Sequence, residues 1–307
     1  MAKGSETGGC LNCYAARLNA RGLPGLLSPT TSKPFARILQ SGPRWTGDVE
    51  LIESQLLLPL KWKKPRKIFV NSMSDLFHEA LTDEAIDRVF AVMALCPQHV
   101  FQCLTKRPER MLQYINGRQW GRMCDIARQI PGGSHSHNPK YPLENVWMGV
   151  SVENQATADA RIPLLLQTPA AVHWISLEPQ LERVGLARYL RPVDGSGPKF
   201  LGWVVQGGES GPGARPFDIQ WARNTIDQCR EADVACFVKQ LGAKPYWPLV
   251  NGLGQWADHV RFSRDTSREA PYHWDEIHLN DRKGSDPAEW PEDLRVQQFP
   301  LEPGAEE

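Results

Sequence analysis

Six short apolar segments recur along the chain, and each runs directly into polar side chains or glycines. The segments are residues 68–70, 100–104, 146–150, 172–175, 203–205 and 236–238. Apolar runs of this length, bounded by polar residues, are typical of buried strands. Helical patterns separate most of them, and such alternation favours parallel strands joined by right-handed connections. The pattern therefore predicts an α/β fold, a TIM-like (β/α) barrel or part-barrel.

Cap residues mark the start of two connecting helices. Thr82 precedes two acidic residues, which suit the positive end of a helix dipole, and Asp218 is the expected cap of a later helix. Pro163 is expected to interrupt the alanine-rich helix that follows residue 154. The predicted apolar faces are Ile86, Val89, Phe90 and Met93 in the first helix, and Ile219, Ala222, Ile226 and Cys229 in the later one.

We expect one barrel-like domain over residues 1–252, with an insertion at 116–145. Residues 253–307 form a C-terminal extension packed on the barrel, because the strand and helix patterns loosen there. Residues 22–43 are rich in Gly, Pro, Ser and Thr, which indicates irregular coil. No strand pattern precedes Cys10, so the first strand of a complete barrel is expected to be missing. Short helices are expected at residues 14–20, 50–60 and 109–115.

Composition places the chain among ordinary globular proteins. Of its 307 residues 41% are hydrophobic and 23% are charged, and the formal net charge is zero. No apolar run approaches the roughly 20 residues that span a bilayer, and the first residues lack the apolar core of a signal peptide. We therefore expect a cytoplasmic protein whose seven cysteines are free thiols or metal ligands, with no membrane partner.

The segment 61–67 carries five basic residues and no acid. Such a run is typical of a solvated turn, and the alternative is a contact with nucleic acid or another anionic ligand.

Candidate site residues follow the predicted strands. The carboxyl ends of barrel strands face one shared site, so polar residues at several of these ends point to a binding site. Those expected to bind a cofactor are Ser72, Asp75, Thr105, Lys106, Ser151, Glu153, Asn154, Gly207, Gly208, Glu209 and Ser210. Arg107, Ser176, Glu178, Gln206, Lys239 and Gln240 lie at the same strand ends.

The glycine-rich loop 207–211 has two interpretations. Two glycines after a strand allow the backbone to approach a ligand closely, and a carboxylate beside them can bind an ammonium group or a ribose hydroxyl. The alternative is a tight turn with a structural glutamate. A phosphate-binding loop is excluded, because no Gly-Lys-Ser/Thr follows.

Cys10 and Cys13 lie two residues apart, which indicates a metal or redox pair. A structural zinc site needs four ligands, and no second Cys-x-x-Cys follows. A thioredoxin-like pair needs a preceding strand, which is absent here. An iron–sulfur cluster held by three thiolates fits a loop above a barrel mouth, and the other five cysteines are expected to be buried small hydrophobes.

Several blocks of the sequence resemble a phage-associated family of unassigned function, whose members carry a three-cysteine motif and are similar to radical S-adenosylmethionine enzymes. The blocks are residues 9–15 (GCLNCYA), 104–108 (LTKRP), 149–154 (GVSVEN), 207–216 (GGESGPGARP) and 284–296. The resemblance covers nearly the whole chain. It implies a barrel or part-barrel of the radical S-adenosylmethionine type.

The resemblance also implies a [4Fe–4S] cluster held by three cysteines, with S-adenosylmethionine on its open iron and an electron donor as a partner. Cys10 and Cys13 match the second and third cysteines of the family motif, and the glycine loop is the expected site of part of the cofactor or substrate. The position of the first cysteine is Lys3. A lysine cannot replace a thiolate, so either the natural start lies further upstream or this member lacks the complete cluster site.

Three hypotheses follow. The first is a radical S-adenosylmethionine-type iron–sulfur enzyme acting on a nucleotide or nucleic acid. The second is a non-catalytic barrel that binds nucleic acid or a partner protein, which Lys3 and the basic segment favour. The third is a zinc-dependent hydrolase that uses Cys10, Cys13 and a histidine such as His78 or His135.

Overall fold

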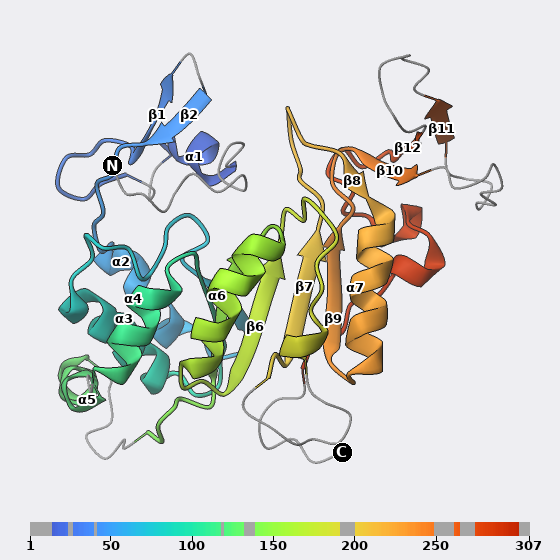
Figure 1. The fold of residues 1–307 in the computed structure, drawn as a ribbon. Coiled ribbons are helices and arrows are strands. Elements are labelled where there is room, and N and C mark those ends of the chain that lie inside the picture. The colour runs from blue at the N-terminus through green and yellow to red at the C-terminus, as the bar shows by residue number, and fades with distance from the viewer. Residues whose placement is uncertain are drawn as a thin grey trace.

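A computed structural model describes residues 14–23, 27–39, 42–117, 120–131, 139–190, 200–248, 261–264 and 274–300. Its centre is a six-stranded parallel sheet that curls into a half-barrel (Figure 1). The strands are β3 (Lys67–Val70), β4 (Val100–Thr105), β5 (Val146–Val152), β6 (Val172–Leu177), β7 (Trp203–Gly207) and β9 (Ala235–Gln240), in that order across the sheet. All six strands expected from the sequence are confirmed, and the part-barrel is the correct alternative.

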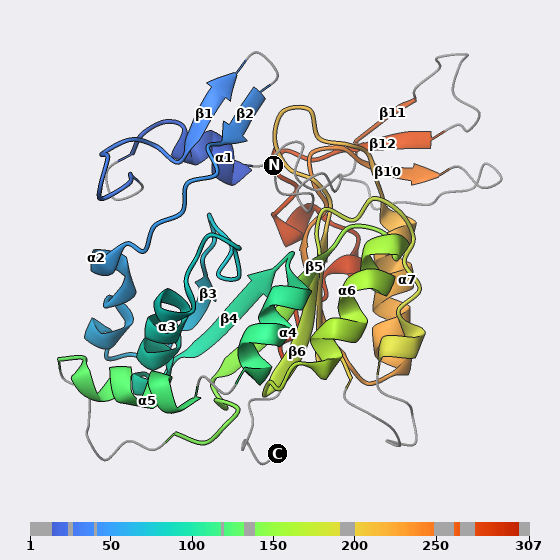
Figure 2. The ribbon, with the colours of Figure 1, turned by 60° about the vertical axis from the view of Figure 1, so that its left-hand side comes forward.

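Helices cover the outer face of this sheet (Figure 2). They are α3 (Asp83–Leu95), α4 (Pro108–Asn116), α6 (Gln155–Gln167) and α7 (Ile219–Glu231), with α5 (Trp120–Gln129) packed on α3. The expected caps are confirmed, because the side chains of Thr82 and Asp218 accept hydrogen bonds from the backbones of Ala85 and Gln220. The expected interruption at Pro163 is wrong. The helix α6 continues to Gln167 because a capping box fixes its start and its apolar face is buried against the sheet.

The inner face of the half-barrel is filled at its amino-terminal half by three tryptophans. Trp174 lies 5.3 Å from Trp203 between ring centres, and Trp147 lies 5.8 Å from Trp203. These rings form one apolar cluster with Val172 and Val205. Nearer the carboxyl ends, the inward positions carry small residues such as serine and glycine. Tryptophan rings therefore fill the inner face at the amino-terminal ends of the strands, and small side chains leave more room at their carboxyl ends.

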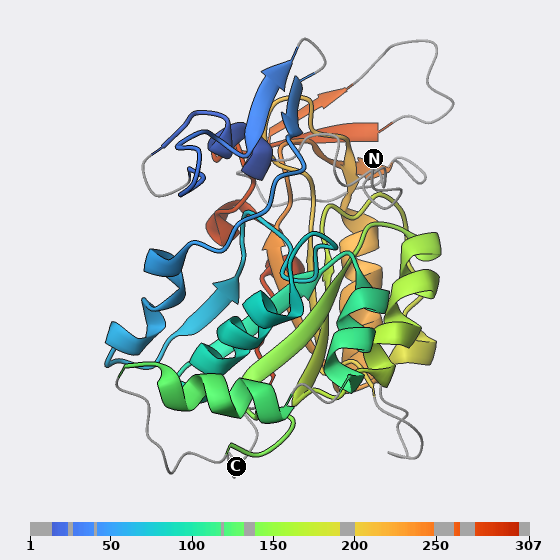
Figure 3. The ribbon, with the colours of Figure 1, turned by 90° about the vertical axis from the view of Figure 1, so that its left-hand side faces the viewer.

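The N-terminal segment contains α1 (Tyr14–Asn19), followed by a hairpin of β1 (Ala36–Leu39) and β2 (Gly42–Trp45). The Asn19 side chain accepts the backbone N–H of Ala36 at 2.9 Å, which joins the helix to the hairpin. The expected helix at 14–20 is confirmed, but irregular coil throughout 22–43 is wrong because these four-residue strands pair with each other. Both elements lie beyond the carboxyl ends of the central strands (Figure 3). The expected helix at 50–60 is α2 (Glu53–Leu56) and a 3-10 turn, Pro59–Lys61.

A second, smaller sheet contains strands from both sides of residue 252, the predicted boundary between the barrel-like domain and the C-terminal extension. Its order is β11 (Arg261–Arg264), β12 (Trp274–His278), β10 (Pro245–Pro248) and β8 (Phe217–Asp218).

After two 3-10 turns at Pro287–Glu289 and Glu292–Leu294, the backbone of Val296 and Gln298 forms hydrogen bonds with the outer edge of β9. The tail thus covers an edge that would otherwise present unpaired backbone groups. None of the described helices is long and apolar enough to cross a bilayer.

The substitution Gly149→Ala tests the tryptophan packing on the inner face. An added Cβ would lie 2.4 Å from the Trp174 ring, which is fully enclosed, so we expect a loss of about 1–3 kcal/mol in the free energy of unfolding. The matched control is Gly121→Ala in α5, where nothing lies within 4 Å of the added carbon. Alanine is the better helix former, so the control should be neutral or slightly stabilising. Urea unfolding of both variants measures the difference, and equal effects would contradict the packing.

Candidate functional site at the mouth of the half-barrel

We define the mouth as the carboxyl ends of the six central strands and the loops that follow them. At its first edge, Asp75 follows β3 and binds the end of β4. Its carboxylate accepts the Thr105 hydroxyl at 2.7 Å, the Lys106 backbone N–H at 3.1 Å and the Arg107 guanidinium at 3.0 Å. Arg107 also pairs with Glu79 at 2.9 Å. One carboxylate therefore fixes three consecutive residues at the end of the neighbouring strand.

Glu153, directly after β5, is the most deeply buried carboxylate of the mouth. Its side chain is 1% exposed and accepts hydrogen bonds from the Lys106 ammonium and from Arg161 at 3.0 Å. Arg161, from α6, also donates to the Ser151 carbonyl at 2.7 Å. Two cations around one buried carboxylate satisfy its oxygens, as a buried charge requires. Through Lys106 and its neighbours, this group is continuous with the Asp75 contacts.

On the far side of the mouth, Glu178 follows β6 and binds the end of β9. Lys239 donates to its two carboxylate oxygens at 3.0 and 2.9 Å, and the Gln240 amide donates at 2.8 Å. Gln240 also donates to the Gly208 carbonyl at 3.0 Å. The Lys239 side chain is 50% exposed, so this ion pair is open to solvent on one side.

The glycine loop after β7 packs against the end of β9. A Cβ on Gly207 would lie 2.9 Å from the Gln240 carbonyl oxygen, and a Cβ on Gly208 would lie 2.3 Å from that of Leu241. Glu209 makes a two-pronged ion pair with Arg215 at 2.9 Å and accepts its backbone N–H. Packing alone therefore requires both glycines, and a role of this loop in holding a ligand stays a prediction.

The predicted site residues thus fall into separate groups. Asp75, Thr105, Lys106 and Glu153 share one hydrogen-bonded network, with the Ser151 backbone carbonyl at its edge. Gly207, Gly208 and Glu209 form the loop described above, and Ser210 follows it half-buried. Asn154 caps α6, since its side chain accepts the Thr157 backbone N–H at 2.9 Å. Ser72 is exposed in the turn after β3.

Sequence reasoning missed Arg161, the second cation on Glu153. The available signal was a lone arginine on a helix face otherwise made of alanine, isoleucine and leucine, because a buried cation needs a buried partner.

The five cysteines in the described part of the chain confirm the prediction of buried small hydrophobic side chains. All five are buried, and the desolvation of Cys103 within β4 raises the pKa of its thiol to about 12. Cys103 also belongs to the core cluster beneath the helices, away from the inner face. Cys10, Cys13, Lys3 and His135 lie outside the described residues. Among the described residues, no group of three or more His, Cys, Asp or Glu side chains could hold a metal ion.

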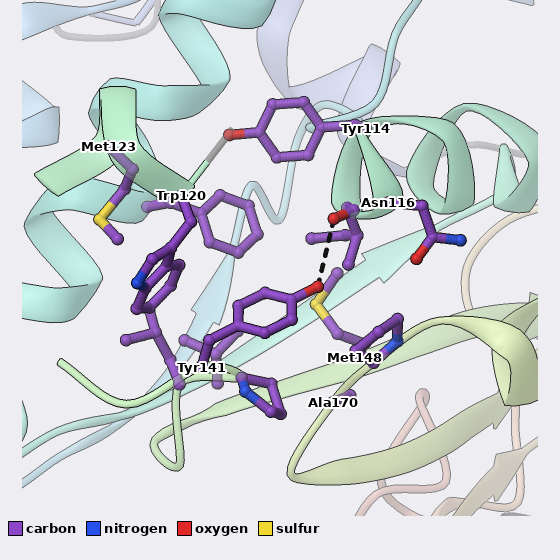
Figure 4. Close-up of a pocket in the computed structure, with 13 residues that line it drawn as sticks. Tyr114, Asn116, Trp120, Met123, Tyr141, Met148 and Ala170 are labelled. Carbon is purple, nitrogen blue, oxygen red and sulfur yellow. Dashed lines mark hydrogen bonds between the residues drawn. The ribbon is translucent and has the colours of Figure 1, made fainter. Parts of the chain in front are cut away.

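A cavity of about 390 Å³ lies at the other end of the strands, on the helix-covered side (Figure 4). Trp120 and Tyr141 form one wall, with ring centres 5.0 Å apart, and the Tyr141 hydroxyl donates to the Ile115 carbonyl at 3.2 Å. Both aromatic residues belong to the segment predicted as an insertion. Its lining is apolar and aromatic, with no charged side chain, so it is a poor place for acid–base chemistry.

Comparison with known proteins gives one match. A protein-family model matches residues 4–280, and it is described as a protein of unknown function (DUF5131). Neither the curated proteins nor the solved structures contain a match to this chain.

Glu153→Gln tests the buried charge at the mouth. The amide keeps the shape of the side chain but leaves Lys106 and Arg161 without their shared negative charge, so we expect about 3 kcal/mol of destabilisation. The matched control is Glu144→Gln, which removes a carboxylate from the exposed pair with Lys140 and should leave stability unchanged within error. Chemical unfolding measures both, and a Glu153→Gln variant as stable as the control would rule out the buried network.

His78 makes stability depend on pH. Burial, assisted by the Arg107 guanidinium, lowers the pKa of His78 below its ordinary 6.5, against the opposing charges of Glu79 and Asp75. The unfolded chain therefore binds a proton before the folded chain does, and the free energy of unfolding falls as pH drops through 6.5 toward the lower folded pKa.

We expect His78→Asn to weaken this dependence between pH 7 and 5. An asparagine oxygen can still accept the Ala80 backbone N–H that the His78 ring accepts at 3.1 Å. Thermal unfolding across this range measures the slope for both proteins. An identical slope in the variant would show that His78 does not contribute.

Proposed function

The chain belongs to the DUF5131 family, and from that premise we propose that it binds S-adenosylmethionine at the mouth of its half-barrel, as a radical S-adenosylmethionine-type protein. The observation that carries the proposal is that charged side chains stand at or shortly after the carboxyl ends of all six parallel strands, at one end of the sheet. Binding sites of β/α barrels form at this end, because the loops there meet above a packed interior. The substrate class that we propose is a nucleotide or nucleic acid.

The Lys239–Glu178 pair suits a ligand that carries one positively and one negatively charged group. S-adenosylmethionine carries an ammonium and a carboxylate on one carbon, which complement Glu178 and Lys239 respectively. The half-exposed lysine can turn from Glu178 to a ligand carboxylate while Gln240 continues to hold Glu178. Charge-assisted hydrogen bonds of this kind are stronger than those between neutral groups.

The Lys106–Glu153 group has a different role in this proposal. Both oxygens of Glu153 are occupied by cations and the carboxylate is buried, so it positions the loop after β5 instead of binding a ligand directly.

The cluster is a separate part of the proposal. Cys10 and Cys13 supply two of three thiolates, and the described cysteines offer no third. We therefore assign no reaction step to a cluster in this chain. When bound, a [4Fe–4S] cluster of this type supplies an electron for cleavage of S-adenosylmethionine.

Equilibrium dialysis with labelled S-adenosylmethionine tests the ligand. We expect saturable binding to the intact chain. Lys239→Ala should weaken this binding about tenfold or more, because it removes one charge-assisted hydrogen bond to the ligand. The control is Lys140→Ala, which removes an exposed lysine that pairs with Glu144, away from the mouth. Absence of saturable binding, or equal weakening by both substitutions, would refute the proposed site.

Anaerobic reconstitution with iron and sulfide tests the cluster independently. Lys3→Cys restores the three-cysteine spacing, so we expect this variant to take up iron and sulfide and to gain the visible absorbance of a cluster. The control, Lys3→Cys combined with Cys13→Ala, should remain colourless, because two thiolates hold a cluster poorly. A colourless Lys3→Cys variant would exclude the radical type and leave the non-catalytic scaffold and the zinc-dependent hydrolase as the remaining hypotheses.

A further inference from the structure

The basic segment 61–67 presents cations that the rest of the described chain does not neutralise. Lys61, Lys63, Lys64 and Arg66 are all exposed. Among the described residues, no carboxylate forms an ion pair with any of these four. The Arg66 guanidinium instead lies 4.6 Å from the centre of the Trp62 ring. The chain as a whole has zero net charge, so the positive charge of these four residues forms a local patch and is not part of a general positive field.

Exposed aromatic rings adjoin the same segment. Phe69, two residues after its end, is 43% exposed and meets Trp174 edge to face at 6.2 Å between ring centres. Phe299, from the C-terminal tail, is also 43% exposed and packs 5.3 Å from Trp203. The Lys67 ammonium lies 4.1 Å from the centre of the Phe299 ring, which joins β3 to the tail across the half-barrel. Each exposed ring is thus backed by the rigid tryptophan cluster.

Cations beside exposed, firmly supported rings suit a single-stranded nucleic acid. The cations bind phosphates, and the exposed Phe69 ring is a surface on which an unpaired base can stack, while Phe299 holds the Lys67 ammonium at the same rim. A duplex could use the cations only, since its bases are already stacked on one another. We propose that the amino-terminal rim of the half-barrel, formed by residues 61–67, Phe69 and Phe299, binds single-stranded nucleic acid. This surface lies at the opposite end from the mouth and does not depend on what the mouth binds.

Fluorescence anisotropy with a labelled single strand of about 16 nucleotides tests this surface at two or more salt concentrations. We expect saturable binding at low salt that weakens as salt rises. Lys63→Glu with Lys64→Glu should reduce affinity at least about tenfold and flatten the salt dependence by about 0.7 per lost phosphate contact. Phe69→Ala should weaken single-strand binding about tenfold without changing the salt slope, because it removes a stacking contact and no charge.

The control for charge is Lys33→Glu with Lys283→Glu, which makes the same change in net charge at two other exposed lysines. It should bind as the unaltered chain does. The proposal is overturned if the control weakens binding as much as the rim variant does. It is also overturned if a duplex of the same length binds as tightly as the single strand, or if no binding occurs at low salt. Circular dichroism of each variant establishes that a loss of binding is not a loss of folding.

Discussion

The packing of Trp147, Trp174 and Trp203 on the inner face of the sheet is the constraint on which the rest of the structure depends. A parallel sheet must cover both of its faces, and here helices cover only the outer one. The tryptophan rings cover the amino-terminal half of the inner face. Trp174 also lies directly over Gly149, where no side chain fits. The tryptophan rings therefore fill the amino-terminal half of the inner face, and serine, glycine and charged residues line its mouth.

Charged side chains link the strand ends at the mouth, both between adjacent strands and, from β6 to β9, across the intervening β7. Asp75 binds the end of β4, Lys106 of that strand end binds Glu153 after β5, and Glu178 after β6 binds Lys239 of β9. Each pair crosses from one strand to another, so together they fix the spacing of the loops. Burying the Lys106–Glu153 pair costs desolvation energy that offsets its electrostatic attraction, so the pair is weak evidence for added stability. Lys239, whose side chain is 50% exposed, is the member of these pairs that we propose turns toward a ligand.

Local patterns predicted the elements that depend on local physics. The six strands, and the helix starts at Thr82 and Asp218, follow from short apolar runs and cap chemistry. The hairpin β1–β2 and the sheet containing β10 and β12 were missed, because strands of four or five residues leave little periodicity to read. Glu153 was identified by its place after a strand, but its partner Arg161 was not. That contact depends on how α6 packs on the sheet, which single-sequence patterns do not encode. Gly207 and Gly208 were recognised as special, while the neighbour that requires them, the end of β9, became evident only in three dimensions.

The central claim is that the mouth of the half-barrel is a ligand site. A crystal structure of the chain grown with S-adenosylmethionine tests it most directly. The account predicts density for the ligand at the mouth, with its amino-acid end between Glu178 and Lys239. Ligand density in the apolar cavity beside Trp120, with the Lys239–Glu178 pair unchanged and the mouth empty, would contradict it.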